Sequence, residues 1–144
     1  MKKTSLLPDV NVWIALTFRS HAHHVPALTW FKTLQNESIL FCRTTQQGFL
    51  RLATNVAVFP KDAVNLSGAW QLYDAILMDQ RIQFVDEPSG IEPQWRIFTQ
   101  GSTFSPKVWN DAYLAAFSVM MGCRFVTFDK GFTRYSGLSL TLLP

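Results

Sequence analysis

Short runs of apolar residues alternate along this chain with longer segments whose apolar residues recur at helical spacing. The short runs predict five strands, at residues 4–8, 38–41, 81–88, 123–128 and 139–143. The longer segments predict helices at residues 10–18, 21–37, 43–54, 60–77, 91–101 and 106–121. Strands that alternate with helices are typical of a mostly parallel sheet covered on both faces. The pattern therefore predicts an α/β fold.

One predicted helix carries a carboxylate on its apolar face, in the stretch SPKVWNDAYLAAF. Ser105 is a favourable N-cap residue and Pro106 suits the first helical position, so the helix is expected to begin there and to end at Gly122. Asp111 lies too deep inside this helix to cap it, and most of its neighbours at helical spacing are apolar. A partly buried carboxylate is costly unless a positive charge meets it. Asp111 therefore requires either a basic side chain or a cation.

Three acidic residues are expected to meet at the carboxyl edge of the sheet. Asp9 directly follows the first strand, and Asp129 follows the strand at residues 123–128. The part of the helix from Asp111 to its end measures roughly 16 Å, and so does the strand that runs back to Asp129. The two equal lengths bring Asp111 and Asp129 to the same level. If the first and fourth strands are parallel neighbours, the three carboxylates converge on one cleft, at the edge where such sheets bind ligands.

Three carboxylates in one cleft require a counter-charge because they repel one another. Mg²⁺ is the natural partner: it takes one or two carboxylates, keeps several waters and binds substrate phosphate oxygens. For each acid there is also a purely structural interpretation, in which it is not a metal ligand. Asp9 would cap the following helix, and Asp129 would serve as a turn or cap residue in FDKGF. For Asp111 the alternative is an ion pair with a basic residue: Arg51, Lys107 or Lys130.

The composition narrows the class of protein. A length of 144 residues suits one domain, residues 1–144, and 48% hydrophobic with 16% charged residues excludes a disordered chain. The net charge of +3 is compatible with a polyanionic partner without establishing one. Cys42 and Cys123 are far apart in the sequence and form no C-x-x-C pair, which is typical of reduced thiols in a cytoplasmic protein.

Several other classes are disfavoured by missing motifs. The sequence has no run of 18 or more apolar residues and no signal peptide pattern, so no membrane segment is expected. It has neither the G-x-G-x-x-G motif nor the G-x-x-x-x-G-K-[ST] motif, which argues against dinucleotide binding and P-loop hydrolysis.

Four segments together resemble the PIN-domain family, and specifically the VapC-type toxins of bacterial toxin–antitoxin pairs: LLPDVNVWIAL, TTQQGFLRLAT, NDAYLAAFSVMMGCRFVTFDKGF and GLSLTLL. The resemblance covers almost the whole chain. It implies a three-layer α/β/α domain and a ribonuclease that depends on Mg²⁺ or Mn²⁺. It also implies a homodimer that is inhibited by a cognate antitoxin. Asp9, Asp111 and Asp129 match the acidic positions of the family, and Asn11 matches a polar position near the first acid.

The chain departs from the family pattern in one place. The family usually has a further acid, most often Glu, on the helix after the second strand, whereas this helix reads TTQQGFLRL. Gln46 is the expected equivalent and Gln47 is the next candidate. An amide oxygen is able to coordinate a cation but brings no negative charge, so the departure bears directly on metal binding and on activity.

Basic residues near the acids are candidates for RNA contacts. Lys130 and Arg134 flank Asp129 and would hold phosphate, or would belong to a solvated turn. Arg51 points either to the cleft or to solvent. The first hypothesis for function is a metal-dependent endoribonuclease in which Asp9, Asp111 and Asp129 hold the metal. The alternative is a PIN-like module with little catalysis that binds RNA or protein.

Overall fold

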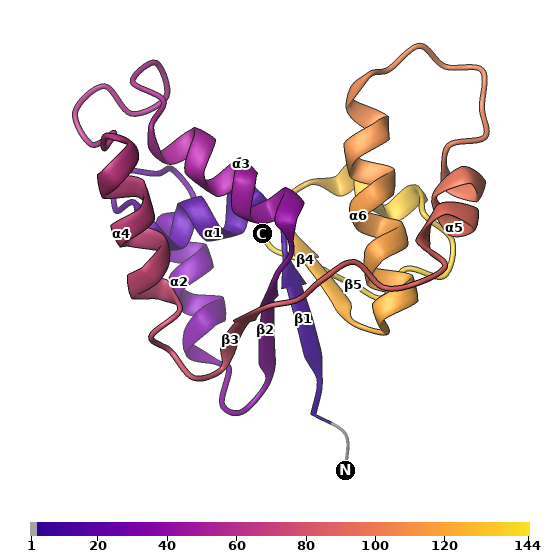
Figure 1. Cartoon of the computed structure of the whole chain (residues 1–144), viewed down its shortest axis with the longest axis horizontal. Coiled ribbons are helices and arrows are strands. Elements are labelled where there is room, and N and C mark those ends of the chain that lie inside the picture. The colour runs from indigo at the N-terminus through magenta and orange to yellow at the C-terminus, as the bar shows by residue number, and fades with distance from the viewer. Residues whose placement is uncertain (1–2) are drawn as a thin grey trace.

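A computed structural model describes residues 3–144 and shows a five-stranded sheet with helices around it (Figure 1). The strands are β1 (Ser5–Pro8), β2 (Ser38–Phe41), β3 (Ile82–Phe84), β4 (Arg124–Thr127) and β5 (Leu140–Leu142). The helices are α1 (Val10–Thr17), α2 (His24–Lys32), α3 (Arg43–Ala53), α4 (Leu66–Ile76), α5 (Ile91–Phe98), α6 (Lys107–Met121) and a 3₁₀ helix, η1 (Lys130–Arg134). The predicted alternation of strands and helices is confirmed.

The sheet is parallel throughout and has the order β3-β2-β1-β4-β5. β1 lies at its centre, between β2 and β4. Pro8 at the end of β1 pairs with Val126 of β4, so these two strands end side by side. The first and fourth strands are therefore parallel neighbours, as the convergence of the acids requires.

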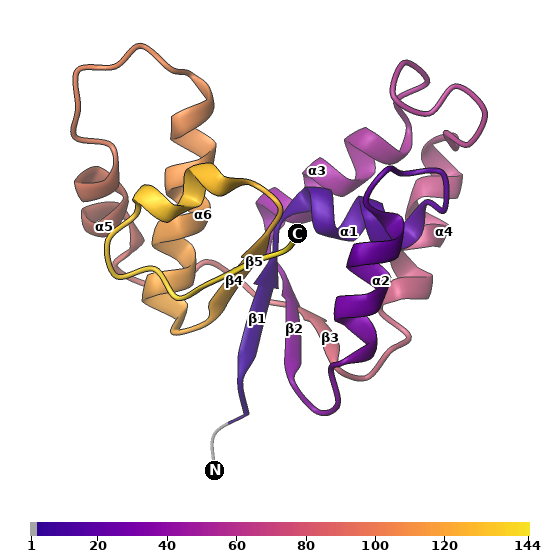
Figure 2. The same cartoon turned by 180° about the vertical axis from the view of Figure 1, so that it is seen from behind.

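Helices cover both faces of the sheet, which confirms the α/β/α layers. α1 to α4 lie on one side and α5 and α6 on the other (Figures 1 and 2). Successive strand residues point to opposite faces. Leu7 and Phe125 accordingly pack with residues of α6, whereas Leu6 and Val126 pack with Val12 of α1.

Several boundaries differ from the sequence-based prediction: α2 is shorter than the helix predicted at residues 21–37, and β3 is shorter than the strand predicted at residues 81–88. Three further differences concern where helices begin or form. The helix expected at residues 60–77 begins only at Leu66, because the Asn65 side chain accepts a hydrogen bond from the Gly68 N–H at 2.7 Å and caps the helix there. The Asp111 helix begins at Lys107 without a side-chain cap, because the carbonyl of Ser105, not its hydroxyl, accepts the Val108 N–H at 3.1 Å. The segment after Asp129 forms η1, which the prediction had as a turn.

No helix within residues 3–144 has the length and the apolar character needed to cross a membrane. Both cysteines are free and buried.

Candidate active site

Asp9 lies at the junction of β1 and α1, where two hydrogen bonds hold its carboxylate. One oxygen accepts the N–H of Val10 at 2.8 Å and caps α1. The other accepts the hydroxyl of Thr127, at the end of β4, also at 2.8 Å. The Asp9 N–H itself donates to the Val126 carbonyl at 2.8 Å. The capping alternative for Asp9 is thus realised, but it uses only one of the two carboxylate oxygens.

Asp129 is positioned by the same threonine. Its N–H donates to the Thr127 hydroxyl at 3.0 Å, and its carboxylate accepts the Gly131 N–H at 2.8 Å, which caps η1. The Thr127 hydroxyl therefore bridges Asp9 and Asp129. Thr127 is fully buried, so this bridge is shielded from water.

Asp111 is buried in α6 and faces a lysine one turn earlier. The Lys107 ammonium lies 3.7 Å from one Asp111 oxygen and donates to Asp129 at 2.8 Å. Of the ion-pair partners proposed for Asp111, Lys107 is the one that the structure provides. A single lysine thus faces two of the three carboxylates, while its own side chain is 70% exposed.

The pKa values show that the three carboxylates lie within range of one another. The pKa of Asp9 is raised to about 6: burial is the main cause, the charges of Asp111 and Asp129 add to the rise, and the two hydrogen bonds oppose it. Burial also raises the pKa of Asp111, with Asp129 adding to the rise and Lys107 opposing it. The hydrogen bond from Lys107 is the main cause that lowers the pKa of Asp129. The carboxyl edge of the sheet therefore concentrates negative charge.

The donor chemistry of this site fits a hard divalent cation. Carboxylate oxygens are the protein ligands that Mg²⁺ and Mn²⁺ prefer. Asp9 accepts two hydrogen bonds but forms no ion pair with any basic residue in the described part of the chain. Across residues 3–144, no group of three or more His, Cys, Asp or Glu side chains lies close enough together to hold a metal ion. Metal binding by all three acids would therefore require their carboxylates to move closer together.

The other predicted residues lie in different surroundings. Asn11 is exposed in the first turn of α1, two residues after Asp9. Gln46 is buried, but it accepts a hydrogen bond from Arg43 and contacts Tyr73, and the structure gives it no hydrogen bond with any of the three acids. Gln47 and Arg51 are exposed on α3. The polar partners of Gln46 are therefore Arg43 of α3 and Tyr73 of α4.

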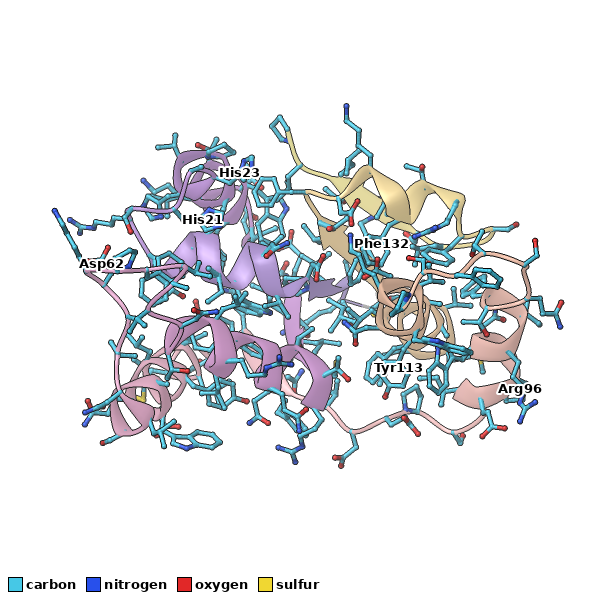
Figure 3. All side chains as sticks on the ribbon, turned by 90° about the horizontal axis from the view of Figure 1, so that it is seen from above. His21, His23, Asp62, Arg96, Tyr113 and Phe132 are labelled. Atoms are coloured by element: carbon cyan, nitrogen blue, oxygen red, sulfur yellow. The ribbon has the colours of Figure 1, made fainter. Side chains whose placement is uncertain are left out.

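The two basic residues of η1 differ from each other. The charge of Arg134 lowers the pKa of both Asp111 and Asp129, so its guanidinium lies near the carboxylates. Lys130 is exposed at the start of η1 and is not among the charges that shift these groups. Figure 3 views this edge of the sheet from above, with Tyr113 and Phe132 on one half of the molecule and His21 and His23 on the other.

Sequence reasoning missed the part that Thr127 plays. A polar residue directly after the apolar pair Phe125 and Val126, two positions before Asp129, was the available signal. Lys107 was considered only as a partner that neutralises Asp111. Its contact with Asp129 was not predictable because the two residues are 22 positions apart.

Known proteins of similar sequence and fold identify the family of this chain. The family model for the PIN domain matches residues 6–138. The chain is 43% identical over 143 residues to ribonuclease VapC41 of Mycobacterium tuberculosis, which covers 96% of this chain and 98% of the relative. It is 29% identical to ribonuclease VapC38 of the same organism, over 87% of this chain and 85% of the relative.

Two solved structures share the fold at low sequence identity. VapBC2 from Rickettsia felis, bound to a DNA fragment from its promoter, matches with a TM-score of 0.67 at 14% identity, over 98% of this chain and 100% of that chain. Mycobacterium tuberculosis VapC20, a toxin that cleaves the sarcin–ricin loop, matches with a TM-score of 0.66 at 14% identity, over 96% and 98%. Together with the family match, these results show that the chain belongs to the PIN-domain family, among its VapC-type toxin ribonucleases.

Proposed function

We propose that this chain, as a single PIN-like unit, is a divalent-metal-dependent endoribonuclease that acts as the toxin of a toxin–antitoxin pair. The observation that carries the proposal is the grouping of Asp9, Asp111 and Asp129, which come from three separate elements and repel one another at the carboxyl edge of the sheet. Repulsion among three carboxylates lowers the free energy of unfolding, so a structural role alone does not account for this grouping.

Each residue has a distinct task in this proposal. Asp9, Asp111 and Asp129 would hold Mg²⁺ or Mn²⁺, which when bound activates water and neutralises charge on a phosphodiester. The two hydrogen bonds to Asp9 orient its carboxylate before substrate arrives. Arg134 lies near the carboxylates and would donate hydrogen bonds to a phosphate oxygen. Lys107, once released from Asp129, would do the same.

The partners follow from the family. VapC41 is named a ribonuclease, and the Rickettsia felis structure contains a VapBC pair. We infer that this chain cleaves RNA, forms a homodimer and is inhibited by a cognate antitoxin. An RNA substrate and two free thiols are consistent with action in the cytoplasm.

Replacing one carboxylate tests the proposal. Asp111→Asn keeps the shape of the side chain and removes its charge, so it should abolish Mn²⁺-dependent RNA cleavage, a loss of at least about a hundredfold, while the circular dichroism spectrum stays unchanged. Asp74→Asn, at an exposed position of α4, is the matched control and should remain active. Full activity of Asp111→Asn would refute the metal role of Asp111.

A second candidate function rests on the missing acid of α3. Gln46 faces Arg43 and Tyr73, so no described residue of α3 supplies a fourth carboxylate at the site. A protein that binds RNA or a partner protein with little catalysis would show this pattern. Wild-type protein that binds RNA but does not cleave it with Mg²⁺ or Mn²⁺ would favour this second function.

A further inference from the structure

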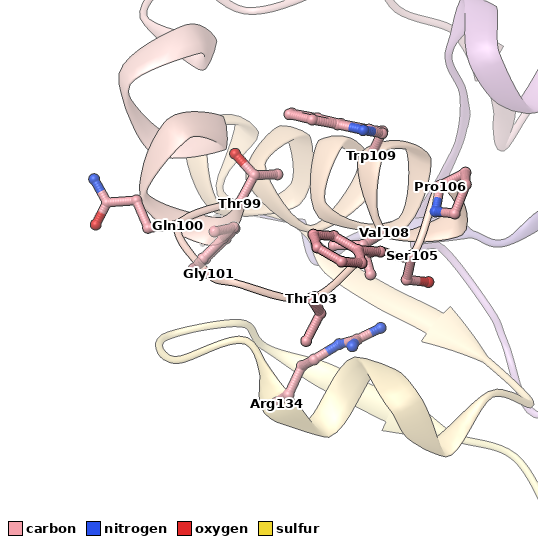
Figure 4. A pocket seen from close by; sticks show the side chains of 11 residues that line it. Thr99, Gln100, Gly101, Thr103, Ser105, Pro106, Val108, Trp109 and Arg134 are labelled. Atoms are coloured by element: carbon pink, nitrogen blue, oxygen red, sulfur yellow. The ribbon is translucent and has the colours of Figure 1, made fainter.

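A cavity beside the carboxylates is not used by the proposed chemistry. It has a volume of about 530 Å³ and lies under the connection between α5 and α6 (Figure 4). Its lining includes Phe104 and Pro106 of that connection, Trp109 of α6 and Arg134 of η1. The volume is within the range of small-ligand sites.

Two aromatic side chains of this cavity are open to solvent. Phe104 is 100% exposed and Trp109 is 59% exposed. Trp109 is supported from behind, because Trp95 donates a hydrogen bond to its carbonyl at 3.0 Å and packs edge-on against its ring. A single exposed apolar residue is ordinary, but here two exposed aromatic rings line one cavity, and each offers a face on which a flat ring can stack.

The charge of the cavity selects the kind of ligand. None of its lining residues is acidic, and Arg134 brings a guanidinium to its wall. This guanidinium lies over the ring of Tyr135, 5.2 Å from the centroid, and it forms no salt bridge within residues 3–144. Figure 4 shows Arg134 reaching from η1 toward the loop at Thr103. A ligand that combines a flat ring with a negative charge suits these groups.

Arg134 also connects the cavity to the candidate active site. It lines the cavity, and its charge lowers the pKa of Asp111 and Asp129. Pro106 lines the cavity as well and directly precedes Lys107, the partner of both acids. A phosphate held by Arg134 would therefore lie at the wall of the cavity and within range of two of the carboxylates.

We propose that this cavity is a base-stacking subsite, in which Phe104 and Trp109 hold one unpaired base of the RNA while Arg134 holds an adjacent phosphate. The proposal rests on the proposed ribonuclease function and adds a requirement to it: the nucleotide beside the scissile phosphate must be unstacked from its neighbours. Stacking is tolerant of sequence because every base has a flat face, so the subsite would favour single-stranded over double-stranded RNA.

The test measures binding without cleavage. In the Asp111→Asn background, fluorescence anisotropy gives the affinity for a 12-nucleotide single-stranded RNA. Phe104→Ala should weaken binding roughly five- to hundredfold, the range typical for loss of one stacked base. Phe104→Leu should weaken RNA binding similarly because leucine keeps apolar area without a ring. Phe104→Trp should keep the affinity of the protein with Phe104 because tryptophan supplies a ring. Because Phe104 is fully exposed, none of these changes should alter folding.

Two controls test whether the loss of RNA affinity comes from a base that stacks on Phe104. Met78→Ala removes another exposed apolar side chain, 81% exposed and outside the cavity, and should leave affinity unchanged. With RNA that carries one abasic position, the difference between wild-type Phe104 and Phe104→Ala should disappear when the abasic position is the one that stacks.

Unchanged RNA affinity of Phe104→Ala would overturn the proposal while leaving the ribonuclease function intact. Loss of antitoxin binding or of self-association in Phe104→Ala, with RNA affinity retained, would overturn it in favour of a protein partner. Absence of RNA binding by both the wild-type and the Asp111→Asn proteins would instead refute the proposed function and the subsite with it.

Discussion

The Asp9 carboxylate has two roles: it caps α1, and it lies within range of the charges of Asp111 and Asp129. Burial favours its protonated form and raises its pKa from 3.8 to about 6. For a carboxyl whose pKa is raised by folding, the favourable contribution is complete below the unfolded pKa. It is lost as the pH rises through the folded pKa.

Without metal, the protein should therefore lose stability between about pH 4 and pH 7. The Asp9 contribution is at most about 3 kcal/mol at 1.36 kcal/mol per pKa unit, and Asp111, whose pKa is also raised, acts in the same direction. Melting curves in chelator measure this loss. Asp9→Asn keeps a good N-cap and has no titrating group, so its stability should depend less on pH. Equal pH dependence of the two proteins would show that Asp9 is not the cause.

Lys107 acts as a tethered positive charge, because its ammonium contacts Asp129 and faces Asp111. A divalent cation at these carboxylates must compete with it. Lys107→Met should therefore tighten Mn²⁺ binding several-fold in calorimetric titration and lower the melting temperature in chelator, because the acids lose their partner. Lys61→Met, at an exposed position outside the site, should change neither quantity. Weaker Mn²⁺ binding by Lys107→Met would contradict the competition.

At the scale of elements, the packing of α1 against α3 decides where Asp9 lies. Gly48 of α3 faces Val10 so closely that a Cβ atom would lie 2.6 Å from one of the Val10 methyl groups. Replacing Gly by Ala inside a helix ordinarily stabilises it by roughly 0.5–1 kcal/mol. Here the clash with α1 is expected to outweigh that gain, because overpacking typically costs about 1–3 kcal/mol.

Gly48→Ala should accordingly lower the free energy of unfolding by about 1–2 kcal/mol in urea titrations. It should also reduce the cleavage rate, because Val10 donates the hydrogen bond that orients Asp9. The double variant Val10→Ala/Gly48→Ala removes the clashing methyl groups and should recover most of the lost stability. A stabilising Gly48→Ala would show that α1 moves aside at little cost.

For the molecule as a whole, the proposed antitoxin must neutralise a site rich in negative charge. An antitoxin segment carrying Arg or Lys would enter beside Asp9 and displace metal by charge competition. Induction of this chain alone should arrest bacterial growth, and co-expression with its proposed antitoxin should restore growth and yield a stable complex. Induction of the Asp111→Asn variant should leave growth unaffected. Growth that continues when the wild-type chain is induced alone would count against the toxin function.

Much of the architecture was predictable from local patterns. The strand at residues 38–41 and the end of α6 at Gly122 lie where the sequence predicts them, because apolar runs and a left-handed C-cap glycine are local features. The start of α4 was predicted wrongly, since the capping hydrogen bond of Asn65 competes with the helix signal of Pro60 and the residues after it. Sequence spacing also anticipated that Asp9, Asp111 and Asp129 lie at one edge.

The sequence alone therefore determined the order of strands and helices and the parallel α/β class. It also determined how far along its helix or strand each acid lies, because the rise per residue of a helix and of a strand is constant. Only the tertiary structure decided which side chains meet there. It assigned Lys107 to Asp129, made Thr127 the bridge between Asp9 and Asp129, and turned Gln46 toward Tyr73. Long side chains have many rotamers, and the choice among them depends on neighbours that are distant in the chain.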